Sequence, residues 1–484
     1  MASNLNELNF SNLVGGKELT LSGKKFEVAS PFYPEFITKV PDSNLFDLKT
    51  CVSKAKSSAI EISKLSFGDR AAILKKTAKN ITFDSKDREY VVKMSGMPIT
   101  FVEKHLQDIK DLLLALPELI ENTLGSRHGR IAGKVLDNHD LFKILYPIDG
   151  IVYSVTPAND PRIVSFISAW LVCLGIPGII KPAKTDFLIA QKVIKKIIEN
   201  GYPASGLNVL GWNTSGENAT KINFSLVDAA KAVWVFGDDT TVDNLLRFED
   251  INGHRVDHFS DKIVLRHSTG RAAAVCDENI ESKKIVNIIT ESCLEWPIGC
   301  NSLKAIFDAS KQSNELTARL TERFSKLEKE TGDPLKHKTK VGFVDKQTLV
   351  NVSKRIKELE SLRLLKKLQG KQISELQSTP FLLATEDKHS EFLAKEFSIY
   401  VLALKKCASF EEAVSEANES AGSNKRLAVS VFSEDEEKVL KTSLHAHHVK
   451  RMRHSTELDI LFHEGNDYLH RLTIPQIHRE KAKS

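Results

Sequence analysis

Several features are missing from this sequence, and each absence excludes a class of protein. No apolar run reaches the roughly 18–20 residues that cross a bilayer, and the longest, around 163–180, is interrupted by serine, glycine and proline. The opening MASNLNELNFSNLVGG has neither a basic start nor an apolar core, so it does not resemble a signal peptide. We therefore expect a cytoplasmic protein without a transmembrane segment.

Cysteine is scarce as well. The 484 residues include six cysteines, without metal-type CxxC spacing. We expect no disulfide framework, and a reducing compartment would keep a reactive thiol usable. The run HAHH, His445 to His448, is too tightly spaced for a defined metal site. The sequence therefore predicts no metal centre.

Glycine-rich phosphate loops are absent too. The strand-like segment at 150–157 is not followed by GxGxxG, and GxxxxGK[ST] does not occur. The net charge of +5 is modest, and basic clusters such as LRLLKKLQGK lack the interleaved aromatics that stack on bases. We expect solvated basic faces and no nucleic-acid partner. An anionic ligand such as a phosphorylated cofactor remains an option.

What is present is a regular alternation of strand and helix patterns. Hydrophobic residues make up 41% of the chain, which suits a globular protein of two or three domains. From residue 150 the strand-like segments are GIVYSVTP, GIIKP, LNVLGW and AVWVFGD, separated by helical patterns. This order predicts a parallel, doubly wound sheet covered on both faces. Such sheets bind ligands at the carboxyl ends of their strands, so the turns after these segments are candidate site loops.

The alternation restarts after about Lys262, with RAAAVCD, SLKAIFD, SIYVLALKK and LAVSVFS as strands. The restart predicts a second α/β domain. A highly charged stretch over 346–372 is predicted to be helical. Cys293 lies inside the helical pattern KKIVNIITESCLE, so we expect it to be packed in the core.

Six segments occur in the order found in the aldehyde dehydrogenase superfamily, which the sequence resembles over nearly its whole length. They are FEVASPFYPEFITKVP, SVTPANDP, GIIKPAK, PASGLNVLGW with VWVFGDDTTVDNLL, WPIGCNSLKAIF and KEFSIYVLALKKCASFEEAVSEAN. The resemblance implies an α/β, aldehyde dehydrogenase-like fold of two doubly wound domains plus an oligomerisation β-arm. It implies a cofactor-binding domain over 1–261 with the arm at about 128–148, a catalytic domain over 262–440, and a return segment and oligomerisation tail over 441–484. A homodimer or homotetramer is implied as well.

Two details resemble the long-chain acyl-CoA (fatty acid) reductases of bacterial bioluminescence, a divergent branch of that superfamily. They are the segment LGSRHG and the seven-residue separation of Cys293 and Cys300. One departure from hydrolytic aldehyde dehydrogenases matters more. Where those enzymes carry a glutamate in an ELGGK-type motif, this chain has RHSTGRAAAVC, with Arg266 or His267 in its place.

A glutamate at that position activates water to hydrolyse a thioester, so a thioester formed without it would survive longer and could exchange with another thiol. The resemblance therefore implies reduction of an acyl-CoA, with a long acyl chain as one option, to an aldehyde. The implied cofactor is NADP, with NAD as the alternative. Two rival hypotheses remain: a CoA-acylating aldehyde dehydrogenase that runs in the oxidative direction, and a catalytically silent scaffold.

The resemblance also implies the catalytic residues. Cys300 would be the nucleophile that forms the acyl thioester. Asn159 would donate its side-chain amide to the oxyanion, together with the backbone N–H of Cys300. His267, or His258, is a candidate proton carrier because histidine titrates near neutral pH. A packed structural role is the alternative for both histidines, and a turn-forming role is the alternative for Asn159.

The implied cofactor-binding residues are Thr156, Pro157, Lys181, Lys184, Gly237, Glu396 and Phe397. Lys181 would contact the adenosine ribose, and Lys184 would add positive charge for NADP. Gly237 would let the next helix approach the pyrophosphate with its N-terminus, although the acidic pair at 238–239 could instead cap that helix. Glu396 would accept hydrogen bonds from the nicotinamide ribose. A solvated lysine and an exposed glutamate are the structural alternatives.

Overall fold

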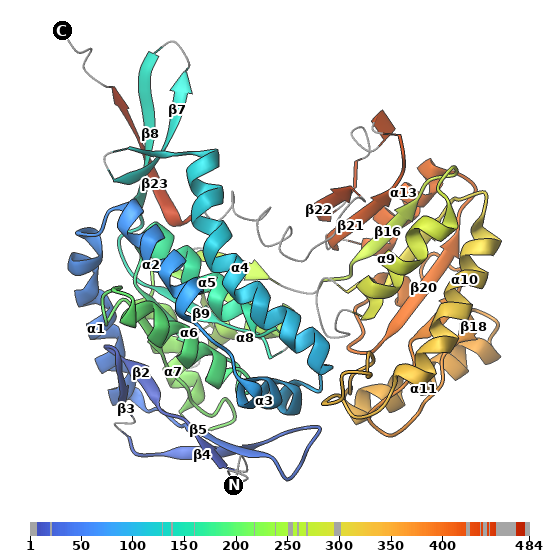
Figure 1. The fold of residues 1–484 in the computed structure, drawn as a ribbon, viewed down its shortest axis with the longest axis horizontal. Coiled ribbons are helices and arrows are strands. Elements are labelled where there is room, and N and C mark those ends of the chain that lie inside the picture. Colours follow the sequence, from blue (N-terminus) through green and yellow to red (C-terminus); the bar gives the residue numbers. More distant parts are fainter. Residues whose placement is uncertain are drawn as a thin grey trace. The chain divides into compact units, whose positions relative to one another are not determined.

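The computed structural model describes most of the chain. The described residues are 7–19, 22–127, 129–136, 139–158, 160–216, 218–237, 239–249, 255–258, 261–267, 270–294, 302–422, 426–435, 437–438, 443–444, 446–451 and 471–479. They form two compact units (Figure 1). The first comprises 1–91, 103–268 and 461–484, and the second comprises 92–102 and 269–460. The second unit thus begins after residue 268, where the sequence predicts a boundary at 261, and most of the predicted return segment and tail over 441–484 lies outside the described residues.

The first unit is built on a seven-stranded sheet in the order β15-β12-β9-β10-β11-β2-β3. Its parallel strands are β9 (Val152–Val155), β10 (Gly178–Lys181), β11 (Leu207–Val209), β12 (Ala232–Phe236) and β15 (Ile263–His267). At one side β2 (Asn12–Val14) and β3 (Lys17–Leu19) continue the sheet antiparallel. Every residue of β10, β11 and β12 is buried, as expected where helices cover both faces. The predicted doubly wound sheet is confirmed.

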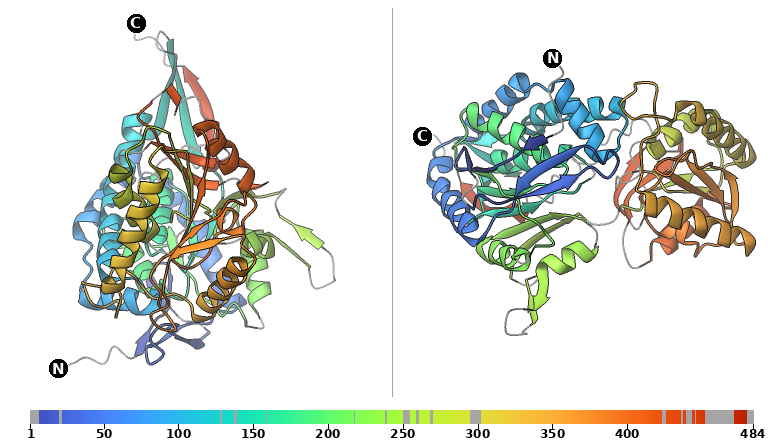
Figure 2. Two further views of the ribbon diagram at one scale, coloured as in Figure 1. Left: turned by 90° about the vertical axis from the view of Figure 1, so that its right-hand side faces the viewer. Right: turned by 90° about the horizontal axis from the view of Figure 1, so that it is seen from below.

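Helices cover both faces of this sheet (Figure 2). From β9 the chain proceeds through β10 to β11, and it then returns past β9 to β12 and β15. Because parallel crossovers are right-handed, this reversal puts the later helices on the opposite face. One group contains α2 (Phe67–Asn80), α5 (Arg162–Leu174) and α6 (Phe187–Glu199), and the other contains α1 (Leu45–Ser63), α7 (Ala219–Ala229) and α8 (Asp239–Leu246). The remaining helices before β9 are α3 (Ser85–Ser95) and α4 (Ile99–Thr123).

The predicted arm is a four-stranded antiparallel sheet in the order β23-β8-β7-β6 (Figure 1). Its strands are β6 (Ser126–Arg127), β7 (Arg130–Leu136), β8 (His139–Pro147) and β23 (Thr473–Arg479). β23 pairs with β8 from Thr473–Pro147 to Arg479–Leu141. A segment near the end of the sequence thus completes the arm. Two smaller groups of strands are β1 (Glu7–Asn9), β5 (Ile37–Pro41) and β4 (Lys25–Ala29), and the pair β13 (Arg247–Glu249) and β14 (Arg255–Asp257).

The second unit contains another seven-stranded sheet, in the order β18-β19-β20-β17-β16-β21-β22. Its strands are β16 (Ala273–Cys276), β17 (Ala305–Asp308), β18 (Lys366–Gln369), β19 (Phe381–Ala384), β20 (Val401–Lys406), β21 (Arg426–Phe432) and β22 (Ala446–Arg451). Its helices are α9 (Ser282–Leu294), α10 (Ser313–Lys326), the 3-10 turn Leu327–Glu330, α11 (Lys346–Ser361), α12 (Glu391–Ala394) and α13 (Phe410–Ala421). Apart from β18, the strands run parallel, which confirms the predicted second α/β sheet.

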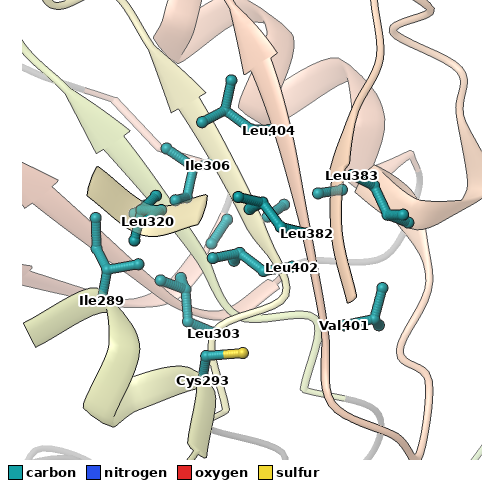
Figure 3. Packing of buried hydrophobic residues seen from close by; sticks show 14 of the residues in the cluster. Ile289, Cys293, Leu303, Ile306, Leu320, Leu382, Leu383, Val401, Leu402 and Leu404 are labelled. Carbon is teal, nitrogen blue, oxygen red and sulfur yellow. The ribbon is translucent and has the colours of Figure 1, made fainter. Parts of the chain in front are cut away.

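The apolar core of the second unit fills the space between the sheet and its helices. Ile289 of α9 and Leu320 of α10 pack over Ile306 and Leu402 of the central strands (Figure 3). Cys293 belongs to this cluster, and its side chain points among the aliphatic groups (Figure 3). The predicted packed role of Cys293 is therefore confirmed.

One secondary-structure prediction is wrong in part. The stretch 346–372 is helical only as far as Ser361, and Lys366–Gln369 form the edge strand β18. The helix ends because Arg363 adopts a left-handed backbone with φ of 58°, which a helix cannot accommodate. The charged KKLQ segment then pairs with β19 across a register shift. Lysines and irregular pairing are usual at sheet edges because they discourage further strand addition.

The described part of the chain bears on the expected absence of a disulfide framework, a metal centre and a transmembrane segment. Cys51, Cys173, Cys276, Cys293 and Cys407 are free thiols. No group of three or more potential metal ligands of the His, Cys, Asp and Glu types occurs among the described residues. Within the same residues, no helix is long and apolar enough to cross a membrane.

Candidate functional site

Most of the predicted cofactor residues of the first unit lie at one edge of its sheet. Thr156 and Pro157 follow β9, Lys181 ends β10, Gly237 follows β12 and His267 ends β15. Val155 is in register with both Lys181 and Val235, so these strands end at the same level. The chain leaves neighbouring β9 and β12 in opposite directions, which makes this edge a topological switch point. Doubly wound sheets bind their ligands at such points.

Hydrogen bonds fasten the two central loops of this edge to each other. The backbone N–H of Thr156 donates to the Lys181 carbonyl at 3.1 Å. The hydroxyl oxygen of Thr156 accepts from the Ala183 N–H at 3.1 Å, and the Thr185 hydroxyl donates to the Ala158 carbonyl at 3.2 Å. The loop that carries Asn159 in the sequence therefore begins from a fixed position.

Lys181 places a positive charge in an unusually dry position. It is 9% exposed, and its Nζ lies 5.1 Å from the centre of the Trp212 ring. Burial, and next the repulsion of Lys184, lower the pKa of Lys181 to about 8. Lys184 is partly exposed, with its Nζ 5.2 Å from the centre of the Phe26 ring. An anionic group bound here would restore the full charge of Lys181.

Gly237 and His267 join the ends of β12 and β15. The Gly237 N–H donates to the His267 carbonyl at 3.0 Å. A Cβ atom at position 237 would come within 3.0 Å of the Thr241 methyl group, so a side chain would crowd the start of α8. The imidazole of His267 stacks on Phe236, with a 4.1 Å centroid separation and a 7° interplanar angle. This contact orients the ring, while its proton-transfer role stays a prediction.

An ion triad holds the start of α5, immediately after position 159. Arg162 is 3% exposed. Its Nε and Nη2 donate to the two carboxylate oxygens of Asp160 at 2.9 and 2.8 Å, and its Nη1 donates to Asp108 of α4 at 3.0 Å. Burial raises the pKa of Asp108. Burial acts in the same direction on Asp160, but Arg162 outweighs it and the pKa of Asp160 lies below its usual value.

Sequence reasoning missed this triad. The stretch Asn-Asp-Pro after the strand is typical of a turn. Asp108, the second carboxylate, lies 54 residues from Arg162 in the sequence. The run NDPR did place an acid and a base two residues apart beside the predicted oxyanion residue. That was the signal available, but it does not identify the helix that supplies the second carboxylate.

The other two predicted cofactor residues, Glu396 and Phe397, belong to the second unit and lie between α12 and β20. One carboxylate oxygen of Glu396 accepts from the Gly270 N–H at 2.7 Å. Burial raises the pKa of Glu396, and the charge of Lys304 opposes that rise. Phe397 stacks on Phe392 at a centroid separation of 4.6 Å. A partly buried carboxylate of this kind can accept hydrogen bonds from hydroxyl groups.

The two central catalytic predictions, Cys300 and Asn159, lie outside the described residues, and their roles stay predictions. Cys293 is 1% exposed, and burial raises the pKa of its thiol to about 11, which disfavours the reactive thiolate. His258 is buried, with Nδ1 3.2 Å from both carboxylate oxygens of Asp261. This position suits the structural alternative for His258.

Two open cavities of about 390 and 400 Å³ lie at the opposite, amino-terminal edge of the first unit's sheet. Gly150 and Pro177, which precede β9 and β10, line both of them. None of the described cofactor candidates contributes to either lining. These cavities are therefore separate from the carboxyl edge that carries the candidate site.

The family model and the curated relatives that match this sequence all describe aldehyde dehydrogenases. The sequence model described as the aldehyde dehydrogenase family matches residues 20–448. A curated relative, malonate-semialdehyde dehydrogenase 1 of Shouchella clausii, is 25% identical over 206 residues, which cover 41% of this chain and 40% of the relative. The matches span about two fifths of the length of the first curated relatives.

Solved structures share the fold over nearly the whole chain. An NAD-dependent benzaldehyde dehydrogenase from Corynebacterium glutamicum has a TM-score of 0.77 at 17% identity, covering 97% of this chain and 98% of the other. An NADP-dependent glyceraldehyde-3-phosphate dehydrogenase from Bacillus halodurans has a TM-score of 0.78 at 14% identity, covering 97% and 99%. At these identities the likeness establishes the architecture alone.

Proposed function

This chain belongs to the aldehyde dehydrogenase family, and from that premise we propose that it reduces an acyl-CoA to an aldehyde with NADPH, through a thioester on Cys300. One observation carries the proposal. The segment IVLRHSTGRAAAVC, from Ile263 to Cys276, contains no carboxylate, although hydrolytic members of the family are expected to carry a glutamate there. Arg266 or His267, the last two residues of β15, would stand at that position.

The missing carboxylate decides what happens to the acyl-enzyme. Without the glutamate that activates water in hydrolytic members, hydrolysis of the Cys300 thioester would be slow. In the first step, the Cys300 thiolate would attack the acyl carbon of the acyl-CoA. The CoA thiolate would then leave and take up a proton, and the acyl group would remain on Cys300. The amide of Asn159 would stabilise the oxyanion in this step. After reduction of the acyl carbon, collapse of the resulting oxyanion would expel the Cys300 thiolate and release the aldehyde.

The residues at the carboxyl edge of the first unit's sheet support binding of the phosphorylated part of a nicotinamide dinucleotide. Lys181 is buried beside Lys184, which suits a phosphorylated ribose. Gly237 leads into α8, whose N-terminal backbone N–H groups favour a pyrophosphate. In the second unit, the Glu396 carboxylate, which accepts from the Gly270 N–H through one oxygen, would accept hydrogen bonds from the nicotinamide ribose. When bound, the dinucleotide supplies the hydride that reduces the acyl carbon.

The oxidative direction is the second candidate. The malonate-semialdehyde relative is named as a dehydrogenase, and that name supports the oxidative direction. In this direction a CoA-acylating aldehyde dehydrogenase would form the same thioester from an aldehyde. Because both directions pass through one intermediate, steady-state assays with acyl-CoA plus NADPH, and with aldehyde plus CoA and NADP, distinguish them. The substrate pair with the larger kcat/KM identifies the preferred direction.

The decisive experiment is mass spectrometry after incubation with a mixture of acyl-CoAs and no cofactor. We expect one acyl group on the peptide that contains Cys300, and its mass gives the chain length accepted. Cys300→Ala should abolish the adduct. Cys293→Ala, which removes a packed cysteine seven positions away, should leave it intact. An unmodified wild type, together with no NADPH-induced rise in melting temperature, would favour the silent-scaffold hypothesis.

A further inference from the structure

A lysine is buried at the amino ends of the parallel strands of the second unit. Lys304 directly precedes β17 and is 2% exposed. Its backbone N–H donates to the Ala272 carbonyl at 3.0 Å, and its carbonyl accepts from the Ala403 N–H at 2.9 Å. Lys304 therefore continues the hydrogen bonding between the central strands, and its side chain cannot reach bulk water without moving them.

The side chain of Lys304 is directed toward the segment that carries Glu396. Its Nζ donates to the Ile399 carbonyl at 3.2 Å. Ile399 lies three residues after Glu396 and shortly before β20. The contact ties the 396–399 segment to the start of β17. Burial of an ammonium group is costly unless hydrogen bonds and an opposite charge compensate it, so this contact implies a counter-charge nearby.

Glu396 supplies that counter-charge. Lys304 and Glu396 stabilise each other's charged forms. Arg271 and the Gly270 N–H also favour the ionised carboxylate. Cys293 of α9 also interacts with Lys304, and its pKa of about 11 keeps its thiol neutral at pH 7. Glu396 is thus the charged acid among these neighbours, and Lys304 and Arg271 are the cations that face it.

We propose that Lys304 is a positioning residue, which keeps Glu396 ionised and oriented so that its carboxylate can accept hydrogen bonds from the two hydroxyls of a ribose. The inference rests on the proposed function for the identity of the ribose, as part of a nicotinamide dinucleotide. The link between Lys304 and Glu396 is independent of that function. Lys304 itself touches neither substrate nor cofactor in this role.

The proposal has a pH dependence with a definite sign. A protonated carboxyl has lost acceptor capacity, so ribose binding weakens as pH falls through the pKa of Glu396. Burial already raises this pKa. Removal of a nearby positive charge should raise it further, by about one pH unit or more. The acid limb of dinucleotide binding then moves to higher pH, while binding at high pH is affected less.

The test compares three substitutions in the full-length protein. Lys304→Gln removes the charge but keeps a donor for the Ile399 carbonyl, and Lys304→Arg keeps the charge. Lys405→Met is the matched control, because Lys405 is also buried, at 6% exposure, and also donates from Nζ to a carbonyl, that of Glu386 at 3.1 Å. It lies at the far end of β20, away from Glu396 along the strand.

Two measurements separate the inference from the proposed function. The first is the pKa of Glu396, taken from the carboxyl-carbon NMR titration of protein labelled with ¹³C-glutamate, with the signal assigned by its loss in Glu396→Gln. The second is the dissociation constant for NADPH between pH 5 and 9. We expect Lys304→Gln to raise the pKa by about one unit or more and to shift the acid limb of binding by the same amount.

Lys304→Arg should keep both quantities near the wild-type values, and Lys405→Met should change neither. An unchanged Glu396 pKa in folded Lys304→Gln would overturn the inference, as would an equal change in Lys405→Met. If Lys304→Gln does not fold, the Glu396 pKa is measured in Lys304→Arg instead. Because the arginine keeps the positive charge, the inference expects little change in that pKa, and a clear shift would overturn it. If wild-type protein binds no NADPH, the proposed function fails while the NMR result still tests the link.

Discussion

Each unit of this protein buries a lysine at an edge of its parallel sheet, and the two lysines have opposite surroundings. Lys181 ends a strand, lies over the Trp212 ring, and has Lys184 as its charged neighbour. Lys304 precedes a strand and faces the Ile399 carbonyl and Glu396. A buried cation beside another cation favours an anionic ligand, whereas a buried cation beside a carboxylate is already compensated. This difference supports the proposed binding role of the first lysine and the proposed positioning role of the second.

The same contrast applies to the two edges that carry the candidate residues. In the first unit they follow the strands, at the carboxyl edge expected of a doubly wound sheet. In the second unit Glu396, Lys304 and Gly270 all precede strands, at the amino edge. The two parallel sheets therefore carry their candidate residues at opposite edges.

Substitution of Arg162 should produce the largest change in stability. Arg162→Met leaves Asp108 and Asp160 without the cation that both contact, and breaking a buried ion pair in this way costs about 3–5 kcal/mol. The free energy of unfolding from urea titration measures it. Arg319→Met removes an exposed ion pair with Glu315 and should cost less than about 1 kcal/mol. Equal losses in the two variants would contradict the assigned burial of the triad.

Arg426 is the corresponding buried arginine of the second unit, and its loss should cost less. Its guanidinium donates to the carbonyls of Ala417, Arg271 and Leu393 and to the Ser420 hydroxyl. These acceptors are neutral, so Arg426→Met should cost roughly 1–3 kcal/mol for polar groups left unsatisfied. Urea titration again measures the loss. A greater loss than in Arg162→Met would reverse the order inferred from charge.

Lys181 should control the alkaline side of cofactor binding. Its ammonium is lost as pH rises through a pKa of about 8, so the dissociation constant for NADPH should rise above that pH. Lys181→Met should weaken binding by about tenfold or more at pH 7, as for a lost hydrogen bond to a charged group, and should abolish this pH dependence. Isothermal titration calorimetry checks both. A wild-type dissociation constant that stays flat to pH 10 would separate Lys181 from the cofactor.

Lys181 should also make stability depend on pH, but here a rise in pH is favourable, whereas it weakens cofactor binding. Its folded pKa, about 8, is below the ordinary 10.5, so between these values the unfolded chain binds more protons and the free energy of unfolding rises with pH. Lys181→Met should flatten the stability profile in this window. Chemical denaturation at pH 7, 8, 9 and 10 measures it, and a wild-type profile that falls relative to the variant would have the wrong sign.

The smallest effect is expected at Cys293. Its thiol is buried and its pKa is about 11, so iodoacetamide at pH 7.5 should leave it unlabelled in the folded protein. Cys293→Ala should cost about 1 kcal/mol, as for a small buried group. Peptide mass spectrometry and urea titration measure these outcomes. Rapid labelling of Cys293 in folded protein would show that α9 opens to solvent.

The alternation of strands and helices in both units follows from local sequence patterns. Strands covered on both faces appear as short apolar runs such as GIIK and AVWVF, because each residue must be buried. This pattern also predicted the turns after GIVYSVTP, GIIKP and AVWVFGD as candidate site loops. The resemblance to the aldehyde dehydrogenase superfamily then implied Thr156, Lys181 and Gly237 in these turns. The charged edge strand β18 was missed because its residues are exposed or partly exposed, and its pairing with β19 is a tertiary contact.

Only the tertiary structure decided which charged groups meet. Arg162 and Asp108 lie 54 residues apart, and Lys304 and Ile399 lie 95 residues apart; local propensity carries no information about such pairs. Whether a lysine is solvated or buried also depends on the elements packed over it, and burial changes the energy of its charge far more than the identity of its neighbours in the sequence. The sequence therefore names the ionisable groups, and the packing of distant segments sets their charge and their partners.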